Sequence, residues 1–179
     1  MVAQIPVLNG HTDAASLMTH GYNAEVACWS PFHGAMYAVT QSLVKAVALG
    51  ADPDTIRLTL QEYFGRMTAD PCRWGKPFAA LLGALDAQLA LGVAAIGGKD
   101  SMSGTFEDLT VPPTLVSFAV TTGRTDEVIS PELKGAGHHL ILLRPCLTED
   151  GLPETASLLS IFQKVTNLCR SGHVHAVWA

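Results

Sequence analysis

A glycine-rich polar stretch, residues 97–104 with the sequence GGKDSMSG, constrains this chain more than any other feature. It directly follows an apolar run and carries three glycines, which allow a tight turn or the close approach of a ligand to the backbone. Lys99 can bind phosphate oxygens, and Asp100 can ligate a divalent cation, which prefers hard oxygen ligands. The hydroxyls of Ser101 and Ser103 can donate to phosphate. The stretch therefore predicts either a site for a polyphosphate nucleotide with magnesium or a polar hairpin that closes a β-sheet.

Composition narrows the partners that such a chain can have. Of the 179 residues, 48% are hydrophobic and 15% are charged, against about 25% charged in a typical soluble domain. This deficit predicts that a second copy, or the rest of a larger protein, covers part of the surface. The net charge of −5 argues against nucleic acid, which favours a basic stripe. No run approaches the ~18 apolar residues of a membrane helix.

The cysteines and the N-terminal residues predict a cytoplasmic protein. No basic and apolar secretory signal opens the chain. The four cysteines are scattered and lack the paired spacing of a metal site, so we expect reduced thiols; they are Cys28, Cys72, Cys146 and Cys169.

The periods of the apolar residues predict an α+β fold. Along the first two thirds of the chain, segments whose apolar residues recur at helical spacing are followed by segments in which apolar and polar residues alternate, as in a strand. A leucine stripe within the second helix is expected to lie in the core; it comprises Phe78, Leu81, Leu82, Leu85 and Leu89. The predicted helices cover residues 31–50, 76–91 and 153–168, and the predicted strands cover 55–63, 93–96, 115–120 and 139–143.

Changes in composition divide the chain into four parts. Residues 1–20 lack periodicity and are expected to form an arm or linker, residues 21–124 a complete domain, and residues 125–137 a connection. Residues 138–179 are expected to begin a second domain. Because residues 173–179 read as a strand without a terminating signal, we expect the chain to be a fragment of a longer one.

Four segments together resemble phosphoribosylformylglycinamidine synthase, also called formylglycinamide ribonucleotide amidotransferase. They are GYNAEVACWSPFHGAMYAV, LTLQEYF, RWGKPFAALLGALDAQLALGV and GGKDSMSGTFEDLTVPPTLVSFAV, in unbroken order from residue 21. The combination of GKDSMS with PPTLVSFAV is specific to the second half of this enzyme within its superfamily. The resemblance implies a domain like the N-terminal domain of aminoimidazole ribonucleotide synthetase, a mixed sheet packed with helices, followed by the start of an α/β C-terminal domain.

The resemblance also implies a function in purine biosynthesis. The family's enzyme is a cytoplasmic C–N ligase that uses ATP to activate the amide of formylglycinamide ribonucleotide. Ammonia from a separate glutamine amidotransferase domain, whose nucleophile motif is lacking here, then displaces the activated oxygen. The fragment is expected to be inactive alone, to complete a dimer-like core with the remainder of the enzyme, and to self-associate when isolated, because its pairing sheet is otherwise exposed.

Site residues carry over from the family only in part. Asp100 corresponds to a magnesium ligand, and the residues beside the nucleotide are Gly97, Gly98, Lys99, Ser101, Met102 and Ser103. The family's second metal-binding pair is replaced by Gln41 and Lys45, one helical turn apart. An ammonium cannot ligate magnesium. Either Lys45 meets phosphate directly, or it forms a buried structural pair with Asp100, which we favour; ATP or ADP with magnesium is thus expected in the family and doubtful in this fragment.

Three further features have competing interpretations. His173 and His175 can share a strand face as a metal pair, although a solvent-facing strand explains them as well. Arg73, Trp74 and Lys76 can form a substrate-facing basic corner, although a surface salt-bridge cluster is the more common arrangement. His33 can contact an anion at a helix N-terminus, although capping is the more common role. The alternatives for the whole chain are a non-catalytic dimerising scaffold and another ATP-using relative such as selenophosphate synthetase.

Overall fold

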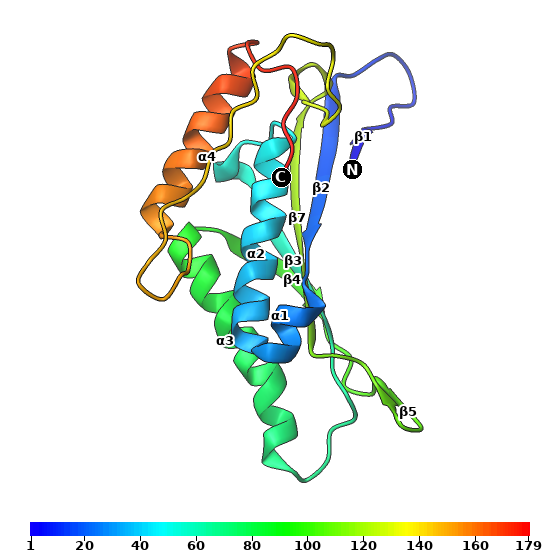
Figure 1. The fold of residues 1–179 in the computed structure, drawn as a ribbon. Helices are drawn as coiled ribbons and strands as arrows, with labels where there is room; N and C mark the ends of the chain where they lie inside the picture. The colour runs from blue at the N-terminus through cyan, green and yellow to red at the C-terminus, as the bar shows by residue number, and fades with distance from the viewer. The chain divides into compact units, whose positions relative to one another are not determined.

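The computed structural model describes residues 1–179 and has the predicted α+β fold. A mixed sheet is combined with helices, and two short 3-10 turns complete the elements (Figure 1). In chain order they are β1 (Val2–Gln4), β2 (Ala14–Gly21), α1 (Ala24–Trp29), α2 (Pro31–Ala48), η1 (Pro53–Thr55), β3 (Arg57–Tyr63), α3 (Pro71–Leu91), β4 (Ala94–Lys99), β5 (Thr105–Phe106), β6 (Leu109–Thr110), β7 (Thr114–Arg124), η2 (Thr125–Glu127) and α4 (Thr155–Arg170).

The main sheet has five strands in the order β1-β2-β7-β3-β4. β3 is antiparallel to β7 and parallel to β4, so its carboxyl end and that of β4 point the same way. β5 and β6 form a separate two-stranded hairpin. The mixed sheet confirms the fold class expected from the sequence.

The chain divides into two compact units, and each unit is discontinuous in sequence. The first unit comprises Met1–Leu17, Val44–Thr55 and Thr121–Ala179, and the second comprises Met18–Leu43 and Ile56–Val120. The second unit therefore contains α1, most of α2, α3 and the strands β3 to β6. The domain limits at residues 124 and 137 stay a prediction.

Within the second unit, α2 and α3 lie on the same side of the strands (Figure 1). α2 buries large apolar side chains, as its spacing predicts: Val39 and Leu43 are 0% and 3% exposed. α3 buries only small residues and one proline; these are Pro77, Ala80, Gly83, Ala84 and Ala87.

The leucine stripe of α3 is exposed, so its placement in the core was wrong. The side chains of Phe78 and Leu89 are 63% and 74% exposed, and those of Leu81, Leu82 and Leu85 are also exposed. The cause is a close helix contact: a Cβ atom on Gly83 would lie 2.0 Å from the carbonyl oxygen of Phe32. Only small side chains fit at that separation, so the large ones face solvent.

The starts of two helices refine the sequence prediction. α3 begins at Pro71, five residues before the expected start, because the Asp70 side chain caps it by accepting a hydrogen bond from the Cys72 amide at 2.9 Å. α1 was not predicted; Asn23 caps it by accepting from the amides of Glu25 and Val26.

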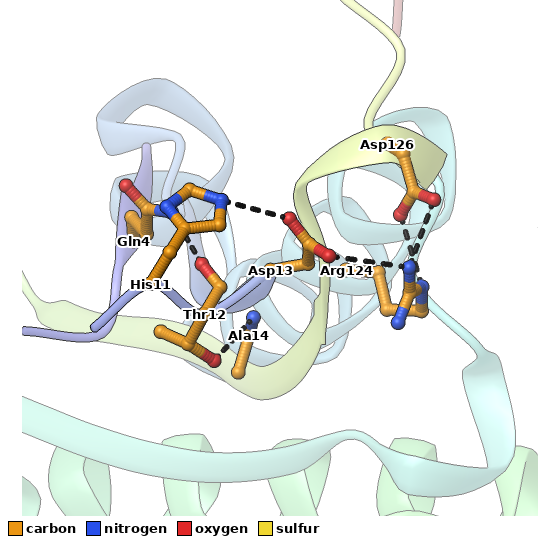
Figure 2. Close-up of polar contacts among 7 residues, drawn as sticks. All are labelled: Gln4, His11, Thr12, Asp13, Ala14, Arg124 and Asp126. Atoms are coloured by element: carbon orange, nitrogen blue, oxygen red, sulfur yellow. Dashed lines mark hydrogen bonds and ion pairs between the residues drawn. The ribbon is translucent and has the colours of Figure 1, made fainter. Parts of the chain in front are cut away.

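In the first unit, the N-terminal residues form strands, so the expected irregular arm was wrong. β1 pairs antiparallel with β2, joining Val2 to Leu17. The loop between them is held by side chains (Figure 2): Asp13 accepts from His11 at 3.2 Å and lies 3.6 Å from the Arg124 guanidinium. Arg124 also donates two hydrogen bonds of 3.0 Å to Asp126, which lower the pKa of that carboxyl.

The rest of the first unit agrees with the prediction in its helix and differs in its strands. α4 confirms the last predicted helix, and its Arg170 forms an ion pair of 2.8 Å with Asp52. Residues 139–143 and 173–179 form no strand. A strand needs a neighbouring backbone to satisfy its hydrogen bonds, and neither segment pairs with a strand of the two sheets. No helix combines the length and apolarity needed to cross a membrane.

Candidate functional site

The glycine-rich stretch lies where β4 ends. Gly97, Gly98 and Lys99 are the last residues of β4, and the loop proper begins at Asp100. A register shift between β3 and β4 leaves Ile96 without a partner on β3. The polar loop thus follows the carboxyl ends of two neighbouring parallel strands, which is where open α/β sheets commonly bind ligands.

Backbone hydrogen bonds hold the loop against the end of β3. The Ser101 amide donates to the Glu62 carbonyl at 3.0 Å, and the Phe64 amide donates to the Ser101 carbonyl at 2.9 Å. Farther along, the Gly104 amide donates to the Phe64 carbonyl at 2.9 Å. The loop therefore follows the neighbouring chain closely and has a defined position for its side chains.

Two of the three glycines serve packing more than a turn. None of them has a positive φ. A Cβ atom on Gly98 would lie 2.8 Å from the Leu60 carbonyl oxygen, and one on Gly104 would lie 2.4 Å from a Val111 methyl. Only at Gly97 is the space open, with Thr59 Oγ1 at 3.9 Å. The expected tight turn is therefore absent, and the close approach is to the protein's own backbone at Gly98.

The polar side chains of the loop are accessible. Lys99 and Asp100 are exposed, and Lys99 Nζ donates to the Asp100 carbonyl at 3.0 Å. Ser101 and Met102 are half-buried and Ser103 is exposed. The hydroxyls of Ser101 and Ser103 make no hydrogen bond within the chain. The loop thus presents an ammonium, a carboxylate and two unused hydroxyls to a ligand.

A buried carboxyl beside this loop was missed at the sequence level. Glu62 of β3 is only 5% exposed, and its Oε1 atom has no hydrogen-bond partner. Burial, and then the charge of Asp100, raise the pKa of Glu62 to about 7. By contrast, the buried hydroxyls of Ser42 and Ser117 bond each other at 2.9 Å. The sequence did contain a signal for this burial, because Glu62 follows Leu58 and Leu60 at every second position and so lies on the same inward-facing side of the strand.

Gln41 and Lys45 stand where the family has its second metal-binding pair, and they have different surroundings. Gln41 is exposed, and its Oε1 accepts a hydrogen bond from the Tyr22 amide at 3.0 Å. Lys45 is half-buried in the last turn of α2, whereas Asp100 is exposed. The pairing of Lys45 with Asp100 stays a prediction, with the Asp100 side chain exposed where a buried one was expected.

Asp100 and Glu62 fit a magnesium ion that arrives with a nucleotide. No group of three or more histidine, cysteine or acidic side chains is arranged for a metal, so no preformed cage exists. Magnesium commonly takes one or two carboxylates and fills its other positions with water and phosphate oxygens. The unpartnered oxygen of Glu62 and the exposed carboxylate of Asp100 supply that number.

The three candidate histidines, His33, His173 and His175, are explained by local contacts. At the start of α2, the His33 amide donates to Ser30 Oγ at 3.4 Å, as in ordinary capping, and His33 Nδ1 lies 2.8 Å from the same hydroxyl. His173 bonds Ser171 at 3.0 Å, while the His175 ring packs on His138 at 5.0 Å. The two histidines therefore have different partners and do not share a strand face.

Comparison with known proteins finds likeness in structure alone. No protein family and no curated protein matches the sequence. Thermotoga maritima PurL complexed with AMPPCP matches 96% of this chain with a TM-score of 0.69 and 19% identity. Phosphoribosylformylglycinamidine synthase II from the same organism matches 89% with a TM-score of 0.66 and 19% identity. The chain has the PurL fold.

The likeness to PurL extends over a limited part of that enzyme. This chain covers 26% of the AMPPCP-bound PurL and 25% of the synthase II chain. PurLQS from Thermotoga maritima matches 66% of this chain, with a TM-score of 0.55 and 23% identity. This chain covers 19% of the matched PurLQS chain. Since the chain spans about a quarter of PurL, the activity and partners of the whole enzyme enter only as proposals.

Proposed function

We propose that this chain is the nucleotide-holding part of the second synthetase half of a phosphoribosylformylglycinamidine synthase, a ligase of purine biosynthesis. The observation that carries the proposal is the position of GGKDSMSG at the end of β4, in a chain whose fold is that of PurL. Thermotoga maritima PurL has been solved with ATP, with ADP and with AMPPCP. On this proposal the fragment binds nucleotide and turnover requires the rest of the enzyme.

The loop's donors suit the phosphates of ATP or ADP. Lys99 provides a point charge, and the hydroxyls of Ser101 and Ser103 provide neutral donors. Magnesium bound by Asp100, with Glu62 as a second carboxylate, would neutralise phosphate charge. Because the pKa of Glu62 is about 7, this carboxyl must lose a proton before it can ligate the ion. The proposal therefore includes metal-dependent binding that strengthens as the pH rises through 7.

The decisive experiment is nucleotide binding by the 179-residue chain. ADP with magnesium should raise the Tm saturably, and omission of magnesium should weaken the effect. Asp100→Asn should remove the magnesium-dependent part. Asp86→Asn, at an exposed position of α3, should retain it. Equal Tm increases in both variants, or no increase in the parent chain, would refute the proposed site.

A dimerising scaffold is the second candidate, because apolar side chains on the second unit's strands remain accessible. On the second unit's strands, Met18, Tyr63 and Ile96 are 38%, 43% and 71% exposed, and every residue of β4 is exposed. We propose that a second copy or the rest of the enzyme covers this face. If a second copy covers this face, sedimentation velocity across a concentration series should show association, and Ile96→Lys should reduce it; a chain that stays monomeric at high concentration would contradict cover by a second copy.

A further inference from the structure

Helix α3 exposes an apolar stripe on the side away from its contact with the Phe32 carbonyl. The residues that pack inward are small and lie on the opposite side of the helix. The stripe has six large side chains, which recur at intervals of three and four residues and so share one face. An exposed apolar face of this length commonly marks a site of association. Its members are between 43% and 74% exposed: Trp74, Phe78, Leu81, Leu82, Leu85 and Leu89.

The stripe is symmetric about its own midpoint. Counted from the point between Leu81 and Leu82, Phe78 lies as far toward one end as Leu85 lies toward the other. The outermost members, an aromatic residue and a leucine, are matched in the same way. A two-fold axis through this midpoint would place two copies of the helix antiparallel and set each member of the stripe against another member. The sequence of the stripe therefore makes it complementary to itself.

The exposed area suits a reversible pair of two copies. At these exposures the six side chains offer on the order of 600 Å² of surface per copy, against about 800 Å² per partner in a stable interface. An interface at the low end of the size range predicts association that depends on concentration. At low micromolar concentrations the chain is then expected to be single, with its stripe exposed.

No charge opposes the approach of a second copy along this face. Asp86 stands at the edge of the stripe, and its two copies would lie about 13 Å apart along the antiparallel pair, at a rise of about 1.5 Å per residue. Salt screens exposed charges at that separation. Arg73 and Lys76 lie on the far side of the helix by their spacing. Neither forms an ion pair, so the predicted surface salt-bridge cluster was wrong.

We propose that two copies of this chain associate through the α3 stripe, as an antiparallel helix pair with its two-fold axis between Leu81 and Leu82. Removal of the aromatic and leucine side chains from water supplies the driving force, and their symmetric order sets the register. The surface shares no residue with the glycine-rich loop or with the exposed strand positions Met18, Tyr63 and Ile96. The pair therefore depends neither on a bound nucleotide nor on association through the strands.

Oxidative cross-linking of Leu82→Cys tests the register. Beside the two-fold axis, the two copies of residue 82 would fall within the Cα separation of about 4.4–6.8 Å that a disulfide requires. The exposed thiols of Cys28, Cys72 and Cys146 are first removed by substitution with serine. Leu82→Cys should then form a covalent dimer, with residue 82 identified as the linked position by mass spectrometry. Ala90→Cys, exposed on the same helix but off the stripe, should not; no dimer through residue 82, or equal yields at both positions, would overturn the proposal.

A charge placed in the stripe provides a second test. Leu85→Lys, added to the Leu82→Cys chain, should lower the yield of the covalent dimer about tenfold or more, because pairing would bury an unpaired ammonium. Leu85 is 49% exposed, so this variant should keep the fold, which circular dichroism verifies. Ala90→Lys and the strand variant Ile96→Lys should leave the yield unchanged. An undiminished yield in Leu85→Lys, or an equal loss in Ile96→Lys, would overturn the proposal.

Discussion

Helices α2 and α3 have similar apolar content but opposite packing. α2 buries Val39 and Leu43, whereas α3 buries alanines and Gly83 and exposes its leucines. The difference arises at one contact, where α3 approaches the Phe32 carbonyl too closely for any side chain at position 83. Helical spacing therefore identified an apolar face on each helix, but on α3 the side that packs is the one with small residues.

The largest effect should come from filling the close contact. Gly83→Val places a Cβ atom where the Phe32 carbonyl oxygen lies 2.0 Å away, and backbone cannot move aside easily. We expect a loss of about 3 kcal/mol or more in the free energy of unfolding, or failure to fold. Gly75→Val, on the same helix with nothing within 4 Å, should fold normally. Comparable stability of the two variants in urea unfolding would refute the close packing of α3.

Leucine truncation tests the two helices directly. Leu43→Ala on α2 should cost about 2–5 kcal/mol, because a buried side chain leaves a cavity. Leu89→Ala on α3, where the side chain is 74% exposed, should change the free energy of unfolding by about 0.5 kcal/mol or less. Chemical denaturation of both variants decides the matter: similar losses would mean that the exposed face of α3 is covered in solution.

Glu62 extends the comparison to a buried polar position. Its pKa is raised from 4.5 to about 7 in the folded chain, so the folded state holds the proton more tightly than the unfolded state. Stability should therefore fall as the pH rises from about 4.5 to 7, by about 2–4 kcal/mol. Glu62→Gln should remove this part of the slope in urea unfolding at pH 5, 6, 7 and 8. Asp86→Asn should keep it, and an unchanged slope in Glu62→Gln would assign the dependence to other groups.

The smallest expected effect is a gain in stability. Gly75 lies inside α3 with open space around its Cα, so Gly75→Ala lowers the entropy lost on folding without a clash. We expect a stabilisation of about 0.5–1 kcal/mol, measured as a rise in Tm. A loss of stability would show that this side of α3 has a neighbour, which would weaken the contrast with α2.

The sequence predicted the elements that are rich in large apolar residues. α2, β3 and α4 were expected because such residues recur at helical or strand spacing, and β7 was expected from the apolar run 115–120. The strand β2 was missed, since its buried positions are occupied by small and polar residues such as Ala15 and Thr19. Residues 139–143 were expected as a strand on their apolar content, but no partner strand is present in the chain.

For the candidate site, the sequence located the loop and misread part of its chemistry. The motif 97–104 was found from its composition, and its donors are accessible as expected. The roles of Gly98 and Gly104 were not visible, because their neighbours Leu60 and Val111 come from other strands and segments. Likewise, Arg66, Arg73 and Lys76 line one cavity although they come from two segments, which a hydrogen bond from Arg73 Nη1 to the Arg66 carbonyl joins.

By itself, the sequence determined the alternation of helices and strands, the glycine-rich loop and the low charge content, since these depend on neighbouring residues. Only the tertiary structure decided which face of α3 is buried, which carboxyl lacks a partner and which cations surround a cavity. The physical reason is that burial and ionisation depend on atoms brought together from distant positions. A period in the sequence marks a face, and the distance to the next element decides whether that face is covered.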